Sequence, residues 1–190
     1  MKILEDRIRK DGRILPGDVV KVDSFLNHLI DVRLAEECAK EWHSLYADCG
    51  VTKILTIESS GIGIACITAQ QFGVPMLYAK KMRTTGSRTD MLVSKVTSYT
   101  HGHTYDVVVN ASFIDKDDRI LIIDDFLANG SALEALISIV KQAGATVVGA
   151  GIAIEKVYQG GGNRIRERGC RVEALARISS IDPNEGIKFC

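Results

Sequence analysis

The sequence predicts an α/β fold in which a central parallel sheet is flanked by helices. Two patterns carry this prediction. Short runs rich in β-branched residues alternate with stretches whose apolar residues recur every three to four positions, which is typical of parallel strands joined by helical crossovers. The run RILII, residues 119–123, is apolar almost throughout, as expected of a strand that is covered on both faces.

Composition narrows the class of protein. The chain has 190 residues, which is the size of a single domain. It carries 24 basic and 24 acidic residues, and a net charge of zero argues against bulk binding of nucleic acid or of a membrane surface. The charged start MKILEDRIRKDGR does not resemble a signal peptide, and no long apolar run is present, so a cytoplasmic protein is expected. The 5 cysteines are widely spaced without a C-x-x-C pair, which predicts neither a zinc site nor a disulfide framework.

The elements of the first half follow from caps, periodicity and breakers. Residues 19–28 alternate between apolar and polar, and we interpret them as an edge element that covers the site. Downstream, the pattern predicts a helix over 31–50 with Asp31 as its N-cap and Gly50 at its end, a strand over 53–57, a turn over 58–61, a helix over 62–72 closed by Gly73, and a strand over 75–79.

Residues 80–104 interrupt this order. They are polar and contain several Gly, Ser and Thr residues, which predicts a mobile loop that runs into an exposed hairpin. A long irregular insertion of this kind is more often functional than accidental. Regular order then resumes with a strand over 119–123, a helix over 131–143 ended by Gly144, a strand over 146–154, a glycine-rich loop over 160–162, a helix over 163–168 and a strand over 171–178.

The segment ILIIDDFLANGSA, residues 120–132, carries the most specific chemistry. A buried strand brings Asp124 and Asp125 to its carboxyl end, where ligands bind in open α/β sheets. A turn of small residues then opens a helix, so that its free backbone N–H groups form a cradle for phosphate. Ser131 can add a hydroxyl donor. The turn consists of Ala128, Asn129, Gly130, Ser131 and Ala132.

The order of these groups suggests a site for a ribose 5-phosphate. Two carboxylates next to a phosphate cradle can accept hydrogen bonds from the vicinal hydroxyls of a sugar whose phosphate lies in the turn. The segment lacks both the lysine of a P-loop and the glycine spacing of a dinucleotide site. The competing interpretation is a solvated Asp-Asp turn that caps an ordinary helix.

These residues resemble the phosphoribosyl pyrophosphate (PRPP) motif of the type I phosphoribosyltransferases. In the same order along the chain, residues 58–61 (ESSG) resemble the pyrophosphate loop of that family, and residues 80–104 resemble its flexible loop. Residues 1–30 and 155–190 resemble its hood over the base. The segments VDSFLNH, TIESSGI and IEK are similar to bacterial members of the family that use xanthine. One departure is that Asn129 and Ser131 stand where many members have threonine or glycine.

The resemblance implies a reaction in which a purine nitrogen attacks C1′ of PRPP and pyrophosphate leaves. Mg²⁺ is expected to bind through PRPP oxygens, without a direct protein ligand. Asp124 and Asp125 are expected to hold the ribose hydroxyls, and the turn 128–132 the 5′-phosphate. Backbone donors to pyrophosphate are expected from Ser59, Ser60 and Gly61, and positive charge from Lys80, Lys81 and Arg83. For the basic residues, a solvated surface run remains the alternative.

The resemblance also implies which residues read the base. Lys156 is expected on the 6-oxo group of a purine, Asn27 at its 2-position, and the backbone around Val20 as a further contact. A surface lysine and a turn asparagine remain the alternatives. Xanthine is the expected base and xanthosine monophosphate the product, with guanine or hypoxanthine as the alternative. A regulator without catalysis is disfavoured because the segment before the core shows no helix-turn-helix pattern. The family further implies a homodimer that binds no nucleic acid and no membrane.

Overall fold

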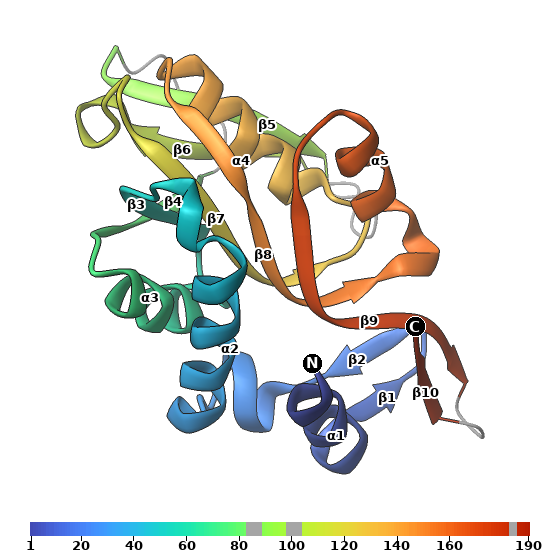
Figure 1. The fold of residues 1–190 in the computed structure, drawn as a ribbon. Coiled ribbons are helices and arrows are strands. Elements are labelled where there is room, and N and C mark those ends of the chain that lie inside the picture. The colour runs from blue at the N-terminus through green and yellow to red at the C-terminus, as the bar shows by residue number, and fades with distance from the viewer. Residues whose placement is uncertain (83–88, 98–103, 183–185) are drawn as a thin grey trace.

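The large sheet is built from strands β3 (Lys53–Ile57), β4 (Met76–Met82), β5 (Met91–Thr97), β6 (Thr104–Asn110), β7 (Arg119–Leu127), β8 (Thr146–Lys156), β9 (Val172–Asp182) and β10 (Gly186–Phe189). A computed structural model describes residues 1–82, 89–97, 104–182 and 186–190. Within these ranges the strand order is β10-β9-β8-β7-β3-β4-β6-β5 (Figure 1). The five inner strands from β9 to β4 run parallel, and the strands at both edges are antiparallel to their neighbours. The predicted α/β class is confirmed.

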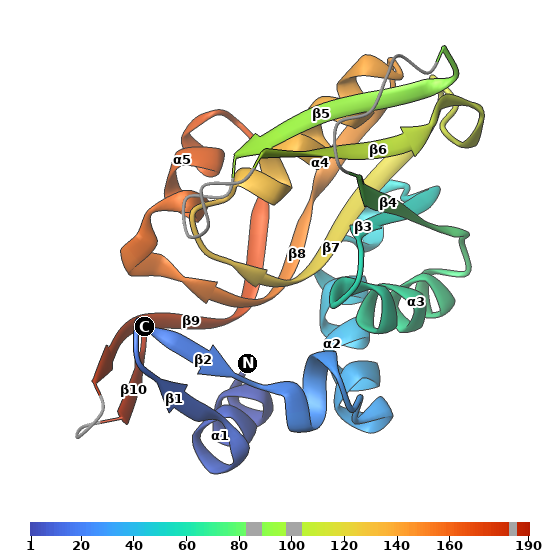
Figure 2. The ribbon, with the colours of Figure 1, turned by 180° about the vertical axis from the view of Figure 1, so that it is seen from behind.

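Helices cover both faces of this sheet. They are α1 (Lys2–Asp11), α2 (Val32–Leu45), α3 (Gly61–Phe72), α4 (Ser131–Gln142) and α5 (Gly161–Glu167). Helices α2 and α3 lie on one face and α4 lies on the other, as the two opposite views show (Figures 1 and 2). A separate antiparallel pair, β1 (Arg13–Leu15) and β2 (Val19–Lys21), lies near the N-terminus.

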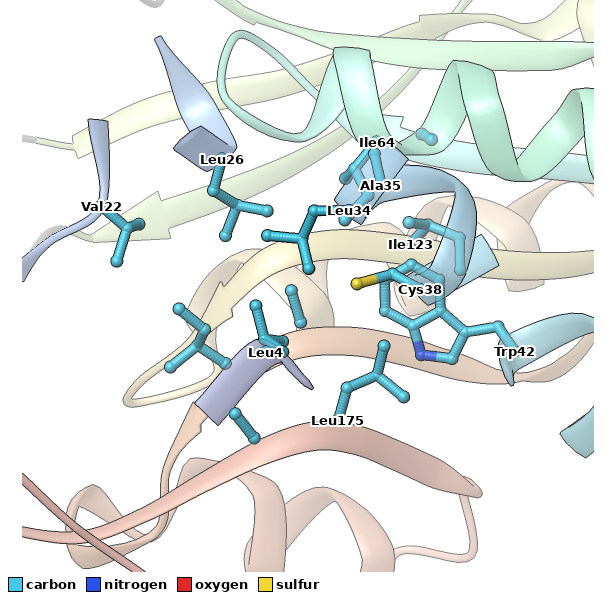
Figure 3. Packing of buried hydrophobic residues seen from close by; sticks show 14 of the residues in the cluster. Leu4, Val22, Leu26, Leu34, Ala35, Cys38, Trp42, Ile64, Ile123 and Leu175 are labelled. Atoms are coloured by element: carbon cyan, nitrogen blue, oxygen red, sulfur yellow. The ribbon is translucent and has the colours of Figure 1, made fainter. Parts of the chain in front are cut away.

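The central position of β7, with a hydrophobic core on each side of the sheet, explains why its sequence is apolar almost throughout. Its side chains alternate between the two faces, so every second residue enters a different core. Ile120 and Ile122 belong to the cluster formed with α4, whereas Leu121 and Ile123 belong to the cluster formed with α1, α2 and α3. Figure 3 shows part of this second cluster, in which Ile123 lies near the fully buried Trp42. The helix α2 begins as predicted, because the Asp31 carboxylate accepts from the Leu34 N–H at 3.2 Å.

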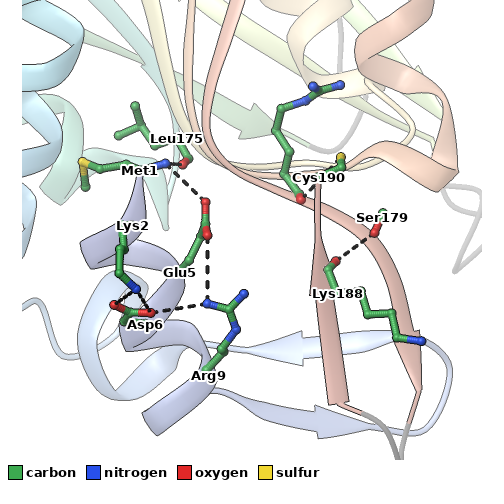
Figure 4. Close-up of polar contacts among 10 residues, drawn as sticks. Met1, Lys2, Glu5, Asp6, Arg9, Leu175, Ser179, Lys188 and Cys190 are labelled. Atoms are coloured by element: carbon green, nitrogen blue, oxygen red, sulfur yellow. Dashed lines mark hydrogen bonds and ion pairs between the residues drawn. The ribbon is translucent and has the colours of Figure 1, made fainter.

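The N-terminal region contains elements that the sequence pattern did not indicate. Helix α1 buries only Leu4 and Ile8, and its remaining residues are polar or charged apart from the exposed Ile3. The amino group of Met1 donates to the carbonyl of Leu175 in β9 (Figure 4). The Arg9 guanidinium stacks 4.6 Å from the centre of the Phe189 ring in β10. The N-terminal helix is therefore held against the C-terminal strands, which are far away in the sequence.

Strand β4 continues further than predicted. Lys80, Lys81 and Met82 pair in antiparallel register with β6, so these residues belong to a strand and not to a loop. Strands β5 and β6 pair in antiparallel register, but β6 runs to Asn110, beyond residue 104 where the predicted insertion ended. The expectation of a mobile loop also concerns residues 83–88, with Arg83, and 98–103, which lie outside the described residues.

Two further findings concern the cysteines and the hydrophobicity of the helices. All 5 cysteines are free thiols. Over the described parts of the chain, none of the helices combines the length and the hydrophobicity that are needed to cross a bilayer.

Candidate active site

The two acids of the motif are buried inside the last part of β7. The apolar run ends at Ile123, but the strand continues to Leu127 because β8 pairs with it along its whole length. The side chains of Asp124 and Asp125 are only 6% and 5% exposed. The sequence therefore placed these acids correctly at the carboxyl end of the sheet, but it did not indicate that they belong to the strand.

Asp125 is held by side chains from two distant segments. Its Oδ2 accepts from Nδ2 of Asn27 at 2.8 Å, and its Oδ1 accepts from the Ser60 hydroxyl at 3.0 Å. Asp124 accepts from the backbone N–H of Asp125 at 3.0 Å. Both oxygens of Asp125 are thus directed by donors, and the carboxylate is fixed in orientation.

Burial, followed by the neighbouring charge of Asp125, raises the pKa of Asp124 well above its ordinary value. The positive charge of Lys81 acts in the opposite direction. A buried acid pair of this kind is stabilised by ligands that donate hydrogen bonds or bring positive charge. Strongly shifted acids of this type are characteristic of functional sites.

The shifted pKa of Asp124 predicts how stability depends on pH. The folded chain binds the proton more tightly than the unfolded chain, so the free energy of unfolding should fall as pH rises from the ordinary aspartate pKa through the raised one. Asp124→Asn removes this loss. Urea unfolding across the acidic to neutral range should show that D124N is the more stable chain at neutral pH, with a weaker dependence on pH. A wild-type chain that gains stability over the same range relative to D124N would contradict this.

The small-residue turn lies between β7 and the N-terminus of α4. Gly130 adopts a left-handed conformation with φ of 84°, which a side chain would disfavour. The Asn129 side-chain oxygen accepts from the backbone N–H of Ser131 at 3.1 Å and from its hydroxyl at 3.0 Å. The hydroxyl of Ser131 therefore binds within the turn, and the backbone N–H groups around Gly130 and Ala132 remain the main candidates for a phosphate.

The loop 58–61 lies directly against the acids. A Cβ atom on Gly61 would collide with Oγ1 of Thr56 and would lie 2.8 Å from Oδ1 of Asp124, so only glycine fits there. The peptide bond between Glu58 and Ser59 is cis. The Glu58 carboxylate accepts from the backbone N–H of Lys81 at 2.6 Å, which ties this loop to β4. The structure therefore brings the loop expected to hold pyrophosphate against the acids expected to hold the ribose.

The two lysines of β4 do not lie together. Neighbouring residues of a strand point to opposite faces. Lys81 lies 5.9 Å from the centre of the Tyr105 ring, and its charge acts on Asp124. Lys80 lies 6.0 Å from the Tyr78 ring and lines a groove with other residues of the outer strands. The structure brings Lys81 to the acids but does not bring Lys80 there.

The residues expected to read a base come from both ends of the chain. Lys156 ends β8 and donates to the backbone carbonyl of Asp18 at 2.7 Å, and its ammonium lies 5.9 Å from the Phe126 ring. Burial lowers the pKa of Lys156. Val20 is buried in the adjacent strand β2. Asn27 ends a short helical turn, Asp23–Asn27, and its amide lies on Asp125.

Sequence reasoning missed three contributions to this site. The side chain of Ser60 orients Asp125, although only its backbone was expected to act. The Glu58 side chain binds β4. The carbonyl of Asp18, a residue with φ of 59°, accepts from Lys156. The left-handed turn could have been suspected from the neighbouring PGD sequence, whereas the other two contacts join segments that no local pattern relates.

Comparison with known proteins agrees with this geometry. Residues 21–171 match the model of the phosphoribosyl transferase domain family. A xanthine phosphoribosyltransferase from Lachnoclostridium phytofermentans is 52% identical over 186 residues, which is 98% of this chain and 96% of that protein. The protein of the same name from Ruminiclostridium cellulolyticum is 52% identical over 182 residues, 96% of each chain. An APRTase structure from Giardia lamblia, complexed with 9-deazaadenine, shares the fold with a TM-score of 0.78 and 20% identity, covering 92% of this chain and 97% of that chain.

Proposed function

The chain belongs to the phosphoribosyl transferase family, and we propose on this premise that it transfers the phosphoribosyl group of PRPP to xanthine, giving xanthosine 5′-monophosphate and pyrophosphate in purine salvage. The observation that carries the proposal is the buried pair of Asp124 and Asp125 between a phosphate cradle and the loop 58–61. The xanthine phosphoribosyltransferases that resemble the chain over nearly its whole length support the choice of base.

The PRPP end of the site acts by positioning and by charge. The turn formed by Ala128, Asn129, Gly130, Ser131 and Ala132 holds the 5′-phosphate, and backbone groups of Ser59, Ser60 and Gly61 hold pyrophosphate. Asp124 and Asp125 accept from the ribose hydroxyls and lie beside the sugar as it gains oxocarbenium character. No protein nucleophile is required, because the departing group is already a stable anion. Lys81 adds positive charge, and Lys80 can join it only after a rearrangement of β4.

Magnesium fits this arrangement as a cofactor that is bound through the substrate. Mg²⁺ would be held by oxygens of PRPP, which are the hard ligands this ion prefers, with the buried carboxylates of Asp124 and Asp125 nearby. When bound, Mg²⁺ neutralises charge on the leaving pyrophosphate.

The base end of the site selects by hydrogen bonding. The Lys156 ammonium only donates, so it requires an acceptor such as the 6-oxo group of xanthine. Asn27 donates one N–H to Asp125, and the second N–H on the same nitrogen can go to the 2-oxo group. Because Asp125 requires a donor, the amide cannot turn its carbonyl toward the base without losing this hydrogen bond. A 2-amino group, as in guanine, is therefore disfavoured. The backbone at Val20 completes the pocket.

A turnover assay with PRPP and four bases tests the function. Xanthine should have the highest kcat/KM of the four bases, guanine and hypoxanthine should fall below it, and adenine should be inactive. Hypoxanthine should fall below xanthine by about 5- to 150-fold, the effect of one unmade hydrogen bond in a partly dry pocket. Asn27→Ala should reduce the difference between these two bases. Because Asn27 also donates to Asp125, the KM for PRPP should rise in the same variant. A hypoxanthine value equal to or above that of xanthine would move the protein to the hypoxanthine and guanine transferases.

The proposal includes how the chain is organised and where it works. One domain spans 1–190, and residues 1–30 with 155–190 form a hood over the base, a role supported by the contact between Lys156 and Asp18. A homodimer is supported by the exposed aromatic rings of Tyr78 and Phe113 near the groove of the outer strands. A cytoplasmic location is supported by the free cysteines, because thiols stay reduced in that compartment. Light scattering of the purified chain tests the dimer.

A further inference from the structure

The phosphate turn rests on helix α5. A Cβ atom on Gly161, at the start of this helix, would collide with the carbonyl of Ala128 and would lie 2.6 Å from the backbone nitrogen of Gly130. The absence of a side chain at Gly161 therefore lets α5 pack directly on the peptide that joins Asn129 to Gly130. The sequence analysis identified the glycine-rich stretch 160–162 within the expected hood over the base, but it assigned this stretch no role at the phosphate turn.

Arg164 of α5 is hydrogen-bonded to the same peptide. One of its terminal nitrogens donates to the carbonyl of Asn129 at 2.5 Å, and its Nε donates to Glu134 at 3.1 Å. Glu134 lies in the first turn of α4, where its backbone N–H donates to the carbonyl of Gly130 at 2.9 Å. Arg164 thus links the turn to the helix that follows it, and its charge strengthens the hydrogen bond to the carbonyl.

The direction of this hydrogen bond matters for anion binding. In a trans peptide the C=O and the N–H point to opposite sides. A carbonyl of Asn129 that is fixed toward Arg164 turns the N–H of Gly130 away from Arg164, as an anion cradle requires. Without this restraint the peptide can rotate, because Gly130 has φ of 84° and glycine has wide conformational freedom. A flipped peptide would present a carbonyl oxygen to the phosphate.

We propose that Arg164 is a positioning residue that aligns the Gly130 N–H for the 5′-phosphate of PRPP. The inference rests on the proposed function, since it concerns the same phosphate turn. It predicts that replacing Arg164 weakens the binding of PRPP but not of the base, because Arg164 contacts neither Lys156 nor Asn27. The competing interpretation is that Arg164 only holds α5 to α4 as an ion pair.

Arg168 provides a matched control. It lies at the C-terminal end of α5 and donates to the same oxygen of Glu134 at 2.8 Å. Among the described residues, its side chain makes no other hydrogen bond, so it does not reach the turn. Replacing Arg168 therefore removes a similar ion pair and leaves the hydrogen bond from Arg164 to the Asn129 carbonyl in place.

Steady-state rates for Arg164→Met, Arg164→Lys and Arg168→Met test the proposal. R164M should raise the KM for PRPP by about 10-fold or more, as expected for loss of a hydrogen bond to a charged group, and should change the KM for xanthine by less than about twofold. R168M should leave both values within about twofold. R164K keeps the charge but cannot grip Asn129 and Glu134 together, so its KM for PRPP should fall between those of R164M and the parent.

Calorimetric titration of PRPP into each variant gives the same comparison without turnover. Equal PRPP affinities of R164M and R168M, or a rise in both KM values of R164M, would overturn the role of Arg164. If R164M does not fold, R164K must still bind PRPP more weakly than R168M. A parent chain that binds PRPP but has no activity on xanthine would refute the proposed reaction and leave this comparison valid. A parent chain that does not bind PRPP would overturn both.

Discussion

Replacing both buried acids, Asp124→Asn with Asp125→Asn, should lower kcat/KM by at least about 100-fold, or roughly 2.7 kcal/mol, in a chain that still folds. Neutral amides cannot stabilise the positive charge that develops on the sugar. Each amide also places a donor where the ribose hydroxyls require an acceptor. The measurement is the rate of nucleotide formation from PRPP and xanthine, with circular dichroism to verify folding.

A control for this variant lies before the other end of the same strand. Asp115 and Asp117 are exposed and precede β7, so Asp115→Asn with Asp117→Asn removes the same charge outside the site. This control should keep kcat/KM within about twofold of the parent, because exposed charges at that distance are largely screened. Near-parental turnover of the folded Asp124 and Asp125 variant would reject the assignment of the ribose site.

Local pattern was sufficient to predict most of the sheet and the phosphate turn. β7, α4 and the turn between them are adjacent in the sequence, so their periodicity and small residues identify them together. The pattern located the end of β7 too early, since the charged Asp124 and Asp125 interrupt the apolar run. Asp125 is hydrogen-bonded to Asn27 and Ser60, which lie 98 and 65 positions away in the sequence.

The N-terminal elements could not be predicted for a related reason. Helix α1 buries two residues, Leu4 and Ile8, too few for a clear apolar stripe. It is stabilised by contacts with the C-terminal strands, such as that between Arg9 and Phe189. The pairing of Lys80 and Lys81 with β6 is likewise tertiary, because polar residues after a short apolar run do not indicate that a strand continues.

Glu155, the residue before Lys156, is a buried charged residue that the sequence composition does not identify. Glu155 is fully buried and accepts from two nitrogens of Arg166, each at 2.7 Å. Arg177 lies 3.4 Å from the same carboxylate. A Cβ atom on Gly162 would collide with Glu155, so the ion pair fills the space between β8 and α5. The pair thus holds the strand end that carries Lys156 against the helix that supports the phosphate turn.

Arg166→Met should therefore destabilise the chain by about 3–5 kcal/mol, because it leaves the buried Glu155 carboxylate without its main partner. Urea unfolding measures this loss. Lys40→Met is the control: Lys40 pairs with Glu37 at the same 2.7 Å, but both side chains are about half exposed, and its loss should be at most about 1 kcal/mol.

The double variant Glu155→Leu with Arg166→Met separates the cost of an unpaired charge from the loss of an attraction. Two apolar side chains leave no charge to desolvate, so most of the stability lost in R166M should return. If the double variant is as unstable as R166M, the ion pair itself stabilises the fold, and burial of an unpaired carboxylate is not the cause. If stability returns but the KM for xanthine rises, the pair acts on function by orienting the end of β8, and its charge is needed for the position of Lys156 and not for folding.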